Sequence, residues 1–253
     1  MAAALASVLG GVIAILRKPT TLFMSTSLGF ASGVLIGTIA FEMVPEAVDL
    51  GSVAIAAIGF AVGFAAIYGV DLFVHRGRLA GAAADQRRKV RLFYRRRRPR
   101  AGDVTVLAGG TSAEELIEGL AIGAGTIVEP SVGILIGLAI AIDNLSEGLS
   151  IGELLRAEAG EENVAKTTKV GEILAWTSTI GVALLLSSVI GWLFLRGVPD
   201  DILALLFATG AGGMFYLTVT DLLPQAEARQ YQESSAIANG AGFLAVFIIS
   251  SQI

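Results

Sequence analysis

The amino-acid sequence predicts an all-α integral membrane protein with eight transmembrane helices, and three observations lead to this fold class. Hydrophobic residues make up 54% of the 253 residues and charged residues only 16%, whereas a soluble domain carries about 25% charged residues. Apolar stretches long enough to cross about 30 Å of hydrocarbon recur along the whole chain. Glycine contributes 31 residues, an excess that favours close packing of helices in lipid.

The spans are assigned from the apolar stretches in chain order. We treat the first stretch as a span and not as a signal peptide, because Arg17 and Lys18 follow its apolar run instead of preceding it. The eight expected spans are residues 1–16, 21–46, 51–75, 104–128, 131–154, 170–195, 200–224 and 236–253.

Lysine and arginine are distributed very unequally between the two sides of these spans. Of 18 basic residues, 17 fall on one side, and only Arg196 falls on the other. The positive-inside rule therefore predicts that the basic side is cytoplasmic and that both termini lie outside. Residues 76–100 hold eleven of the basic residues and are expected to form a cytoplasmic loop that contacts anionic lipid heads instead of nucleic acid. A second loop at 155–169 is expected to be a solvated connector.

Two internal repeats indicate a transporter. LIEGLAIG at 116–123 and LSEGLSIG at 145–152 agree at six of eight positions and fall in consecutive, antiparallel spans. Spans 2 and 7 also correspond, at an offset of 179 residues, through Gly33 and Gly212, Glu42 and Asp221, Pro45 and Pro224, and Ala47 and Ala226. We therefore expect inverted repeats that relate spans 1–3 to spans 6–8, with spans 4 and 5 as the central pair, an organisation typical of membrane transporters.

Carboxylates inside the central pair point to a metal site. A carboxylate at mid-bilayer costs several kcal/mol unless it is paired, solvated or bound to a cation, and no Lys or Arg lies at a comparable depth. The i,i+4 pairs Glu114 and Glu118, and Asp143 and Glu147, each share one helix face. Five carboxylates and one amide could thus line one dry pocket, where a divalent cation would relieve the repulsion. The candidate ligands are Glu114, Glu115, Glu118, Asp143, Asn144 and Glu147.

Some of these acidic residues could instead face water at the ends of helices. This alternative applies to Glu114 and Glu115 if their span begins near residue 113. It applies most to Glu42 and Asp221, which are weaker metal-ligand candidates because each stands three residues before a proline that is expected to end its helix. The absence of cysteine and the single His75 exclude thiolate and multi-histidine metal sites.

The segments EELIEGLAIGAG and IDNLSEGLSIG resemble the paired fourth and fifth helices of the ZIP (Zrt/Irt-like) family of divalent metal transporters. FEMVPEA and TDLLPQA look like the second and seventh helices of that family. The resemblance covers essentially the whole chain. It implies the metal ligands Glu114, Glu115, Glu118, Asp143, Asn144 and Glu147, with Glu118 and Glu147 at the positions that can bridge two metals.

The sequence departs from the family pattern at several positions. Glu114 and Asp143 replace the two motif histidines, and Ser146 replaces the motif proline. Val182 stands near the place where many members carry an acidic residue in the sixth helix, and the histidines of the cytoplasmic loop are missing. These departures leave zinc specificity less supported than membership of the family.

The sequence as a whole predicts one transmembrane transporter domain over residues 1–253, in a cell membrane. Its expected substrate is a divalent cation of the zinc, iron, manganese or cadmium class, carried into the cytoplasm without an organic cofactor, and the resemblance implies a homodimer. A non-transporting metal-sensing or scaffolding protein of the same fold remains the alternative. We do not expect an enzyme, because no HExxH motif is present and Ser146 has no neighbouring base.

Overall fold

The computed structural model describes every residue except 75–102, 160–168, 228–230 and 253. The described residues form helices and no strands. These helices are α1 (Ala2–Leu16), α2 (Thr21–Thr38), η1 (Ile39–Met43), α3 (Val44–Leu50), α4 (Val53–Val74), α6 (Asp103–Val128), α7 (Pro130–Ala159), α8 (Lys169–Phe194), α9 (Asp200–Leu217), η3 (Thr218–Leu222), α10 (Leu223–Glu227) and α11 (Gln232–Ser250).

The helices agree closely with the apolar stretches of the sequence. In the described residues, five helical segments are long and apolar enough to cross a membrane, namely Thr21–Leu50, Pro130–Arg156, Val170–Phe194, Asp200–Glu227 and Gln232–Ser250. Ala2–Leu16 and the part of α4 from Val53 to Gly69 are shorter apolar helical segments. The all-helical prediction is thus confirmed for the described part of the chain, and the basic loop at 76–100 lies wholly outside it.

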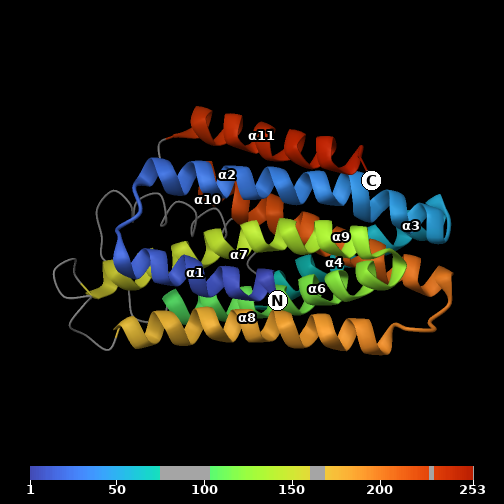
Figure 1. Ribbon diagram of the computed structural model, residues 1–253, viewed down its shortest axis with the longest axis horizontal. Coiled ribbons are helices and arrows are strands. Elements are labelled where there is room, and N and C mark those ends of the chain that lie inside the picture. Colours follow the sequence, from blue (N-terminus) through green and yellow to red (C-terminus); the bar gives the residue numbers. More distant parts are fainter. Residues whose placement is uncertain (75–102, 160–168, 228–230, 253) are drawn as a thin grey trace.

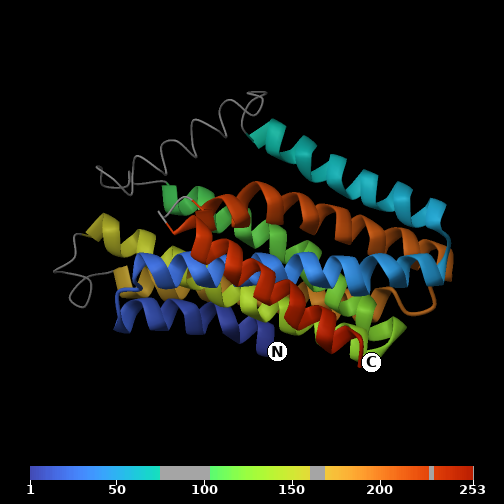
Figure 2. The same cartoon turned by 90° about the horizontal axis from the view of Figure 1, so that it is seen from above.

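The helices lie side by side along the long axis of the molecule (Figures 1 and 2), and the contacts between them define two groups. In the first group, α1 packs against α7 and α8, and α6 packs against α7 and α8. In the second group, α2 packs against α11, and α4 packs against α9. Contacts of α2 with α7 and of α6 with α9 join the groups. The central pair of the sequence, α6 and α7, therefore lies inside the first group.

Each of the two helix pairs in the second group has a close backbone contact, and the two contacts are related by the offset seen in the sequence. Gly33 of α2 lies against the main chain of Asn239 in α11, and Gly212 of α9 lies against the main chain of Phe60 in α4. Each residue of the second contact differs from one of the first by 179 positions. Corresponding residues therefore make both contacts. The glycine lies on the earlier helix of the α2–α11 pair and on the later helix of the α4–α9 pair.

The two segments that contain Glu42 and Asp221 form π-helices, η1 and η3. In each segment the backbone bond spans five residues, from Val44 N–H to the carbonyl of Ile39 and from Leu223 N–H to the carbonyl of Thr218. The prediction that Pro45 and Pro224 end these helices was wrong. The wider turn accommodates the missing N–H of each proline, so that the helix continues without exposing backbone groups to lipid.

The first residues of the connector expected at 155–169 belong to a helix. The α7 helix runs on to Ala159, and Arg156 donates from Nη1 to the carbonyl oxygens of Ala14 and, at 2.8 Å, Ile15 in α1. The carbonyl groups at the C-terminal end of a helix lack intrahelical donors, and an arginine satisfies them well. Arg156 is therefore an interhelical contact and not part of a solvated loop.

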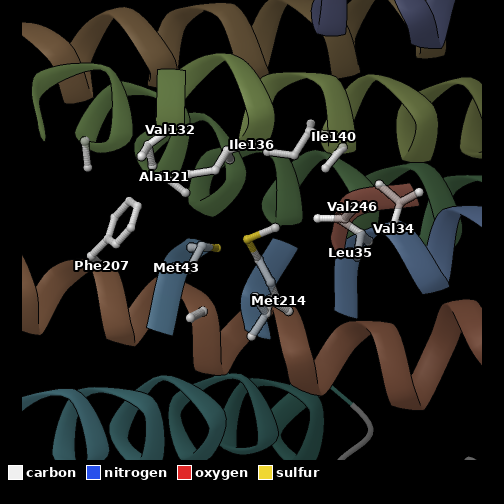
Figure 3. Packing of buried hydrophobic residues seen from close by; sticks show 14 of the residues in the cluster. Val34, Leu35, Met43, Ala121, Val132, Ile136, Ile140, Phe207, Met214 and Val246 are labelled. Carbon is white, nitrogen blue, oxygen red and sulfur yellow. The ribbon is translucent and has the colours of Figure 1, made fainter. Parts of the chain in front are cut away.

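An apolar cluster fills the space between the two groups. Figure 3 shows Met43 of η1 and Met214 of α9 directed toward one another, close to Ala121 of α6 and Ile136 of α7. Phe207, which is 1% exposed, belongs to the same cluster. On α6 and α7, these side chains lie between the acidic motifs and the turn at Glu129, so the acidic motifs have an apolar layer on that side.

Candidate metal site

The candidate site lies in the middle of α6 and α7, two consecutive helices joined at Glu129. The first motif places Glu114, Glu115 and Glu118 on α6, near the middle of its 26 residues. The second motif places Asp143, Asn144 and Glu147 on α7, near the middle of its 30 residues. Because the two helices pack against each other, the motifs meet at one depth.

The structure buries most of these polar side chains. Glu115 is 1% exposed and Asn144 is fully buried, and Asn144 Nδ2 donates to Glu115 Oε2 at 3.3 Å. Glu118 and Asp143 are also buried. Glu114 and Glu147 are partly buried, and their side chains interact electrostatically across the two helices. The expectation that Glu114 and Glu115 could face water therefore fails for Glu115.

Electrostatic interactions connect the two helices across the site. The charges of Glu114, Glu115 and Asp143 all act on Glu118. The same three charges, together with that of Glu118, act on Glu147. Several like charges in a region of low dielectric constant cannot all stay ionised without cations. The arrangement therefore favours a bound cation or bound protons.

Three buried oxygen atoms of the site have no hydrogen-bond partner in the described residues: Glu115 Oε1, Asp143 Oδ1 and Asn144 Oδ1. Buried polar atoms normally have partners, so each such atom needs an explanation. A divalent cation bound between α6 and α7 would supply one. Carboxylate and amide oxygens suit manganese and magnesium and also bind zinc and ferrous iron.

The side chains do not converge on one point in this conformation. Within the described part of the chain, no group of three or more His, Cys, Asp or Glu side chains is arranged to hold a metal ion. Asn144 donates to Glu115 Oε2, whereas Glu115 Oε1 has no partner in the described residues. Glu115 could therefore offer Oε1 to an ion and keep its bond from Asn144, but other carboxyl groups of the site would have to move toward the ion.

The structure treats the two weaker candidates differently. Glu42 is 8% exposed within η1, and its charge acts on Glu46, one helical turn further along. Asp221 in η3 is exposed, and its charge acts on Glu114. Asp221 is therefore close enough to Glu114 for the two charges to interact, whereas Glu42 interacts with Glu46 at the start of α3.

Two contacts that hold the site in place were missed by the sequence analysis. The carbonyl oxygen of Ala3 in α1 accepts from Asn144 Nδ2 at 3.4 Å. Ser187 Oγ of α8 donates to the main-chain oxygen of Glu115 at 2.9 Å. The only sequence signal was the spacing of small residues along the first helix, such as Ser7 and Gly11, which is common in membrane helices.

Known proteins resemble this chain over most of its length. A zinc transporter ZupT of Corynebacterium efficiens is 29% identical over an alignment of 265 positions, which covers 98% of this chain and 93% of the relative. A zinc transporter ZupT of Corynebacterium glutamicum is 31% identical over 241 residues, 88% of this chain and 86% of the relative. The chain belongs to the ZIP family of metal transporters.

Other ZIP-family relatives agree with this assignment. A zinc transporter ZupT of Salmonella heidelberg is 30% identical over 230 residues, which cover 88% of this chain and 82% of the relative. No family model matches the chain. As a ZIP-family protein with apolar helices of membrane-spanning length, the chain is a multi-pass membrane protein.

Proposed function

We propose that this protein carries divalent metal cations across a cell membrane into the cytoplasm, with its binding site between α6 and α7. The ligands would be Glu114, Glu115, Glu118, Asp143, Asn144 and Glu147, and Asp221 would interact with the ion near Glu114. The proposal rests above all on the unpartnered oxygens of Glu115, Asp143 and Asn144, which are buried between two helices of a metal-transporter family.

The proposed ion is of the zinc, iron, manganese or cadmium class. Relatives bear the name zinc transporter, which supports zinc as one substrate. All candidate ligands here are oxygen donors, and such donors distinguish poorly between zinc and manganese, although the general order of affinities still favours zinc. We therefore propose a broad site. The process needs no covalent chemistry and no organic cofactor, and the protein is not expected to be an enzyme.

The proposed mechanism is alternating access through movement of one helix group against the other. The six proposed ligands lie on α6 and α7, in the group of α1, α6, α7 and α8, whereas Asp221 belongs to the second group. The two groups meet mainly through contacts of α2 with α7 and of α6 with α9. The equivalent contacts of the α2–α11 and α4–α9 pairs support an inverted-repeat topology of eight spans. We propose that both termini lie outside, that the loop at 76–100 is cytoplasmic, and that the protein is a homodimer.

Metal uptake into proteoliposomes tests this proposal. Vesicles with the wild-type protein should accumulate radiolabelled Zn²⁺ or Mn²⁺ down a gradient, whereas a metal-sensing or scaffolding protein would give no uptake. Glu118→Gln and Glu147→Ala should each remove most of the uptake, because each loses a charge that the buried cation requires. The matched control is Glu233→Gln, which neutralises an exposed glutamate in the first turn of α11. Normal uptake by Glu147→Ala would show that the site has been placed wrongly.

A further inference from the structure

The α1 helix lies parallel to α7 along its whole length. Ala3 contacts Asn144, Ser7 lies against Gly148, and the carbonyls of Ala14 and Ile15 receive Arg156, a nearly constant offset along both helices. The backbones approach closely. A Cβ atom added at Gly10 would overlap the carbonyl oxygen of Leu145 and lie 2.9 Å from the amide nitrogen of Leu149.

This close approach brings a main-chain acceptor of α1 to the metal site. Asn144 Nδ2 donates to Ala3 O at 3.4 Å and to Glu115 Oε2 at 3.3 Å. Both bonds are long, so neither is strong alone. Together they fix the orientation of the amide, because a flipped amide would turn Oδ1 toward two acceptors that offer no proton.

The fixed orientation decides which atom Asn144 can offer to an ion. With Nδ2 directed at Ala3 and Glu115, the remaining polar atom is Oδ1, which is buried and has no partner in the described structure. A metal ion binds the oxygen of an amide and not its NH2 group, which has no free lone pair to donate. The orientation seen here is thus the one that a cation site needs.

We infer that α1 is a positioning element of the metal site, because the carbonyl oxygen of Ala3 holds the Asn144 amide with its oxygen toward the ion. This inference rests on the proposed function and assigns α1 a role that the acidic motifs do not reveal. At the opposite end of the helix pair, Arg156 of α7 donates to the C-terminal carbonyls of α1 and so holds α1 in place beside α7. Groups that orient a metal ligand are typically worth 10–100-fold in affinity.

The experiment compares two adjacent glycines of α1 by calorimetric titration of the full-length protein in detergent with Zn²⁺. Gly10→Ala pushes α1 away from the backbone of α7, whereas the three atoms nearest to a Cβ added at Gly11 are all side-chain atoms of α8, with Thr177 Cγ2 at 2.9 Å. We expect Gly10→Ala to weaken affinity about tenfold and Gly11→Ala to change it less than about twofold. Equal affinities in Gly10→Ala and the wild type would overturn the inference.

A double-mutant cycle separates positioning from general damage to the fold. If α1 acts through Asn144, Gly10→Ala should have almost no further effect on affinity once Asn144→Ala has removed the amide. Additive losses would mean that α1 is merely structural, and would overturn the inference. If Asn144→Ala weakens binding but Gly10→Ala does not, only the role of α1 is lost. If the wild-type protein binds no Zn²⁺, the proposed function fails with it.

A second variant keeps the inference testable if Gly10→Ala does not fold. Asn144→Asp retains an oxygen ligand and adds negative charge. It also replaces the NH2 group that donates to Ala3 and Glu115 by an oxygen, which cannot donate. We expect binding at least about fivefold weaker than in the wild type, because the lost orientation outweighs the better ligand. Affinity equal to or above that of the wild type would show that the donor contacts play no part.

Discussion

Replacing Gly33 by alanine is expected to destabilise the α2–α11 pair. The new Cβ atom would overlap the carbonyl oxygen of Asn239 and lie 2.7 Å from its carbonyl carbon. Because the obstacle is backbone, the two helices must separate. That movement also stretches the 2.8 Å hydrogen bond from Asn239 Nδ2 to Ser32 Oγ.

The magnitude follows from three terms. Overpacking of a close contact costs about 1–3 kcal/mol, and an interhelical hydrogen bond in a membrane protein contributes about 0.6 kcal/mol. Alanine regains roughly 1 kcal/mol over glycine in a helix interior. The net loss at Gly33 is therefore about 0.5–2.5 kcal/mol. The matched control is Gly240→Ala in α11, where no atom lies within 4 Å of the added Cβ, so only the gain of up to about 1 kcal/mol remains.

The assay is thermal unfolding in detergent, followed by the loss of monodisperse protein on size-exclusion chromatography. The two variants should differ by about 1.5–3.5 kcal/mol, which corresponds to a separation in Tm on the order of 3–14 °C for a chain of this size. Gly212→Ala, which meets Phe60 as Gly33 meets Asn239, should lower Tm by a similar amount. A Gly33→Ala protein that melts at or above Gly240→Ala would refute the close approach of the backbones.

Two further predictions concern selectivity and the basic loop. The double substitution Glu114→His and Asp143→His should raise the ratio of zinc to manganese affinity, because imidazole favours zinc over manganese; an unchanged or lower ratio in a competition titration would mean that these positions do not touch the metal. Shortening the loop at Arg87–Arg98 should reduce expression or correct insertion but leave metal affinity unchanged, because we propose that its basic residues set the topology and take no part in the site. A tenfold loss of affinity in a correctly inserted protein would contradict this.

The positions of the helices and the pairing of the acidic motifs could be predicted from the sequence, because both depend on local properties. Span length follows from the thickness of the bilayer, and an i,i+4 pair such as Asp143 and Glu147 shares a helix face whatever surrounds it. The contact between Glu115 and Asn144 was not predicted, although the two residues stand at matching positions of the repeats, 29 residues apart.

Three features could not be predicted because they depend on contacts between distant segments. The prolines at 45 and 224 were expected to end helices, yet π-turns carry the helices past them. Arg156 looked like a loop residue because its acceptors are main-chain carbonyls 141 and 142 positions away. The contact from Ala3 to Asn144 uses a backbone oxygen, which every residue possesses, so no residue type marks it.

The equivalent helix pairs α2–α11 and α4–α9 have a consequence for energetics. Each pair is joined by a glycine against a main-chain carbonyl, at residues that correspond through one constant offset. Two conformations that differ by exchanging the roles of these pairs would make nearly the same contacts, and their free energies would be nearly equal. The protein itself would then impose little preference for either conformation, so that neither would accumulate at the expense of the other, and both would be available to bind the ion from their own side of the membrane.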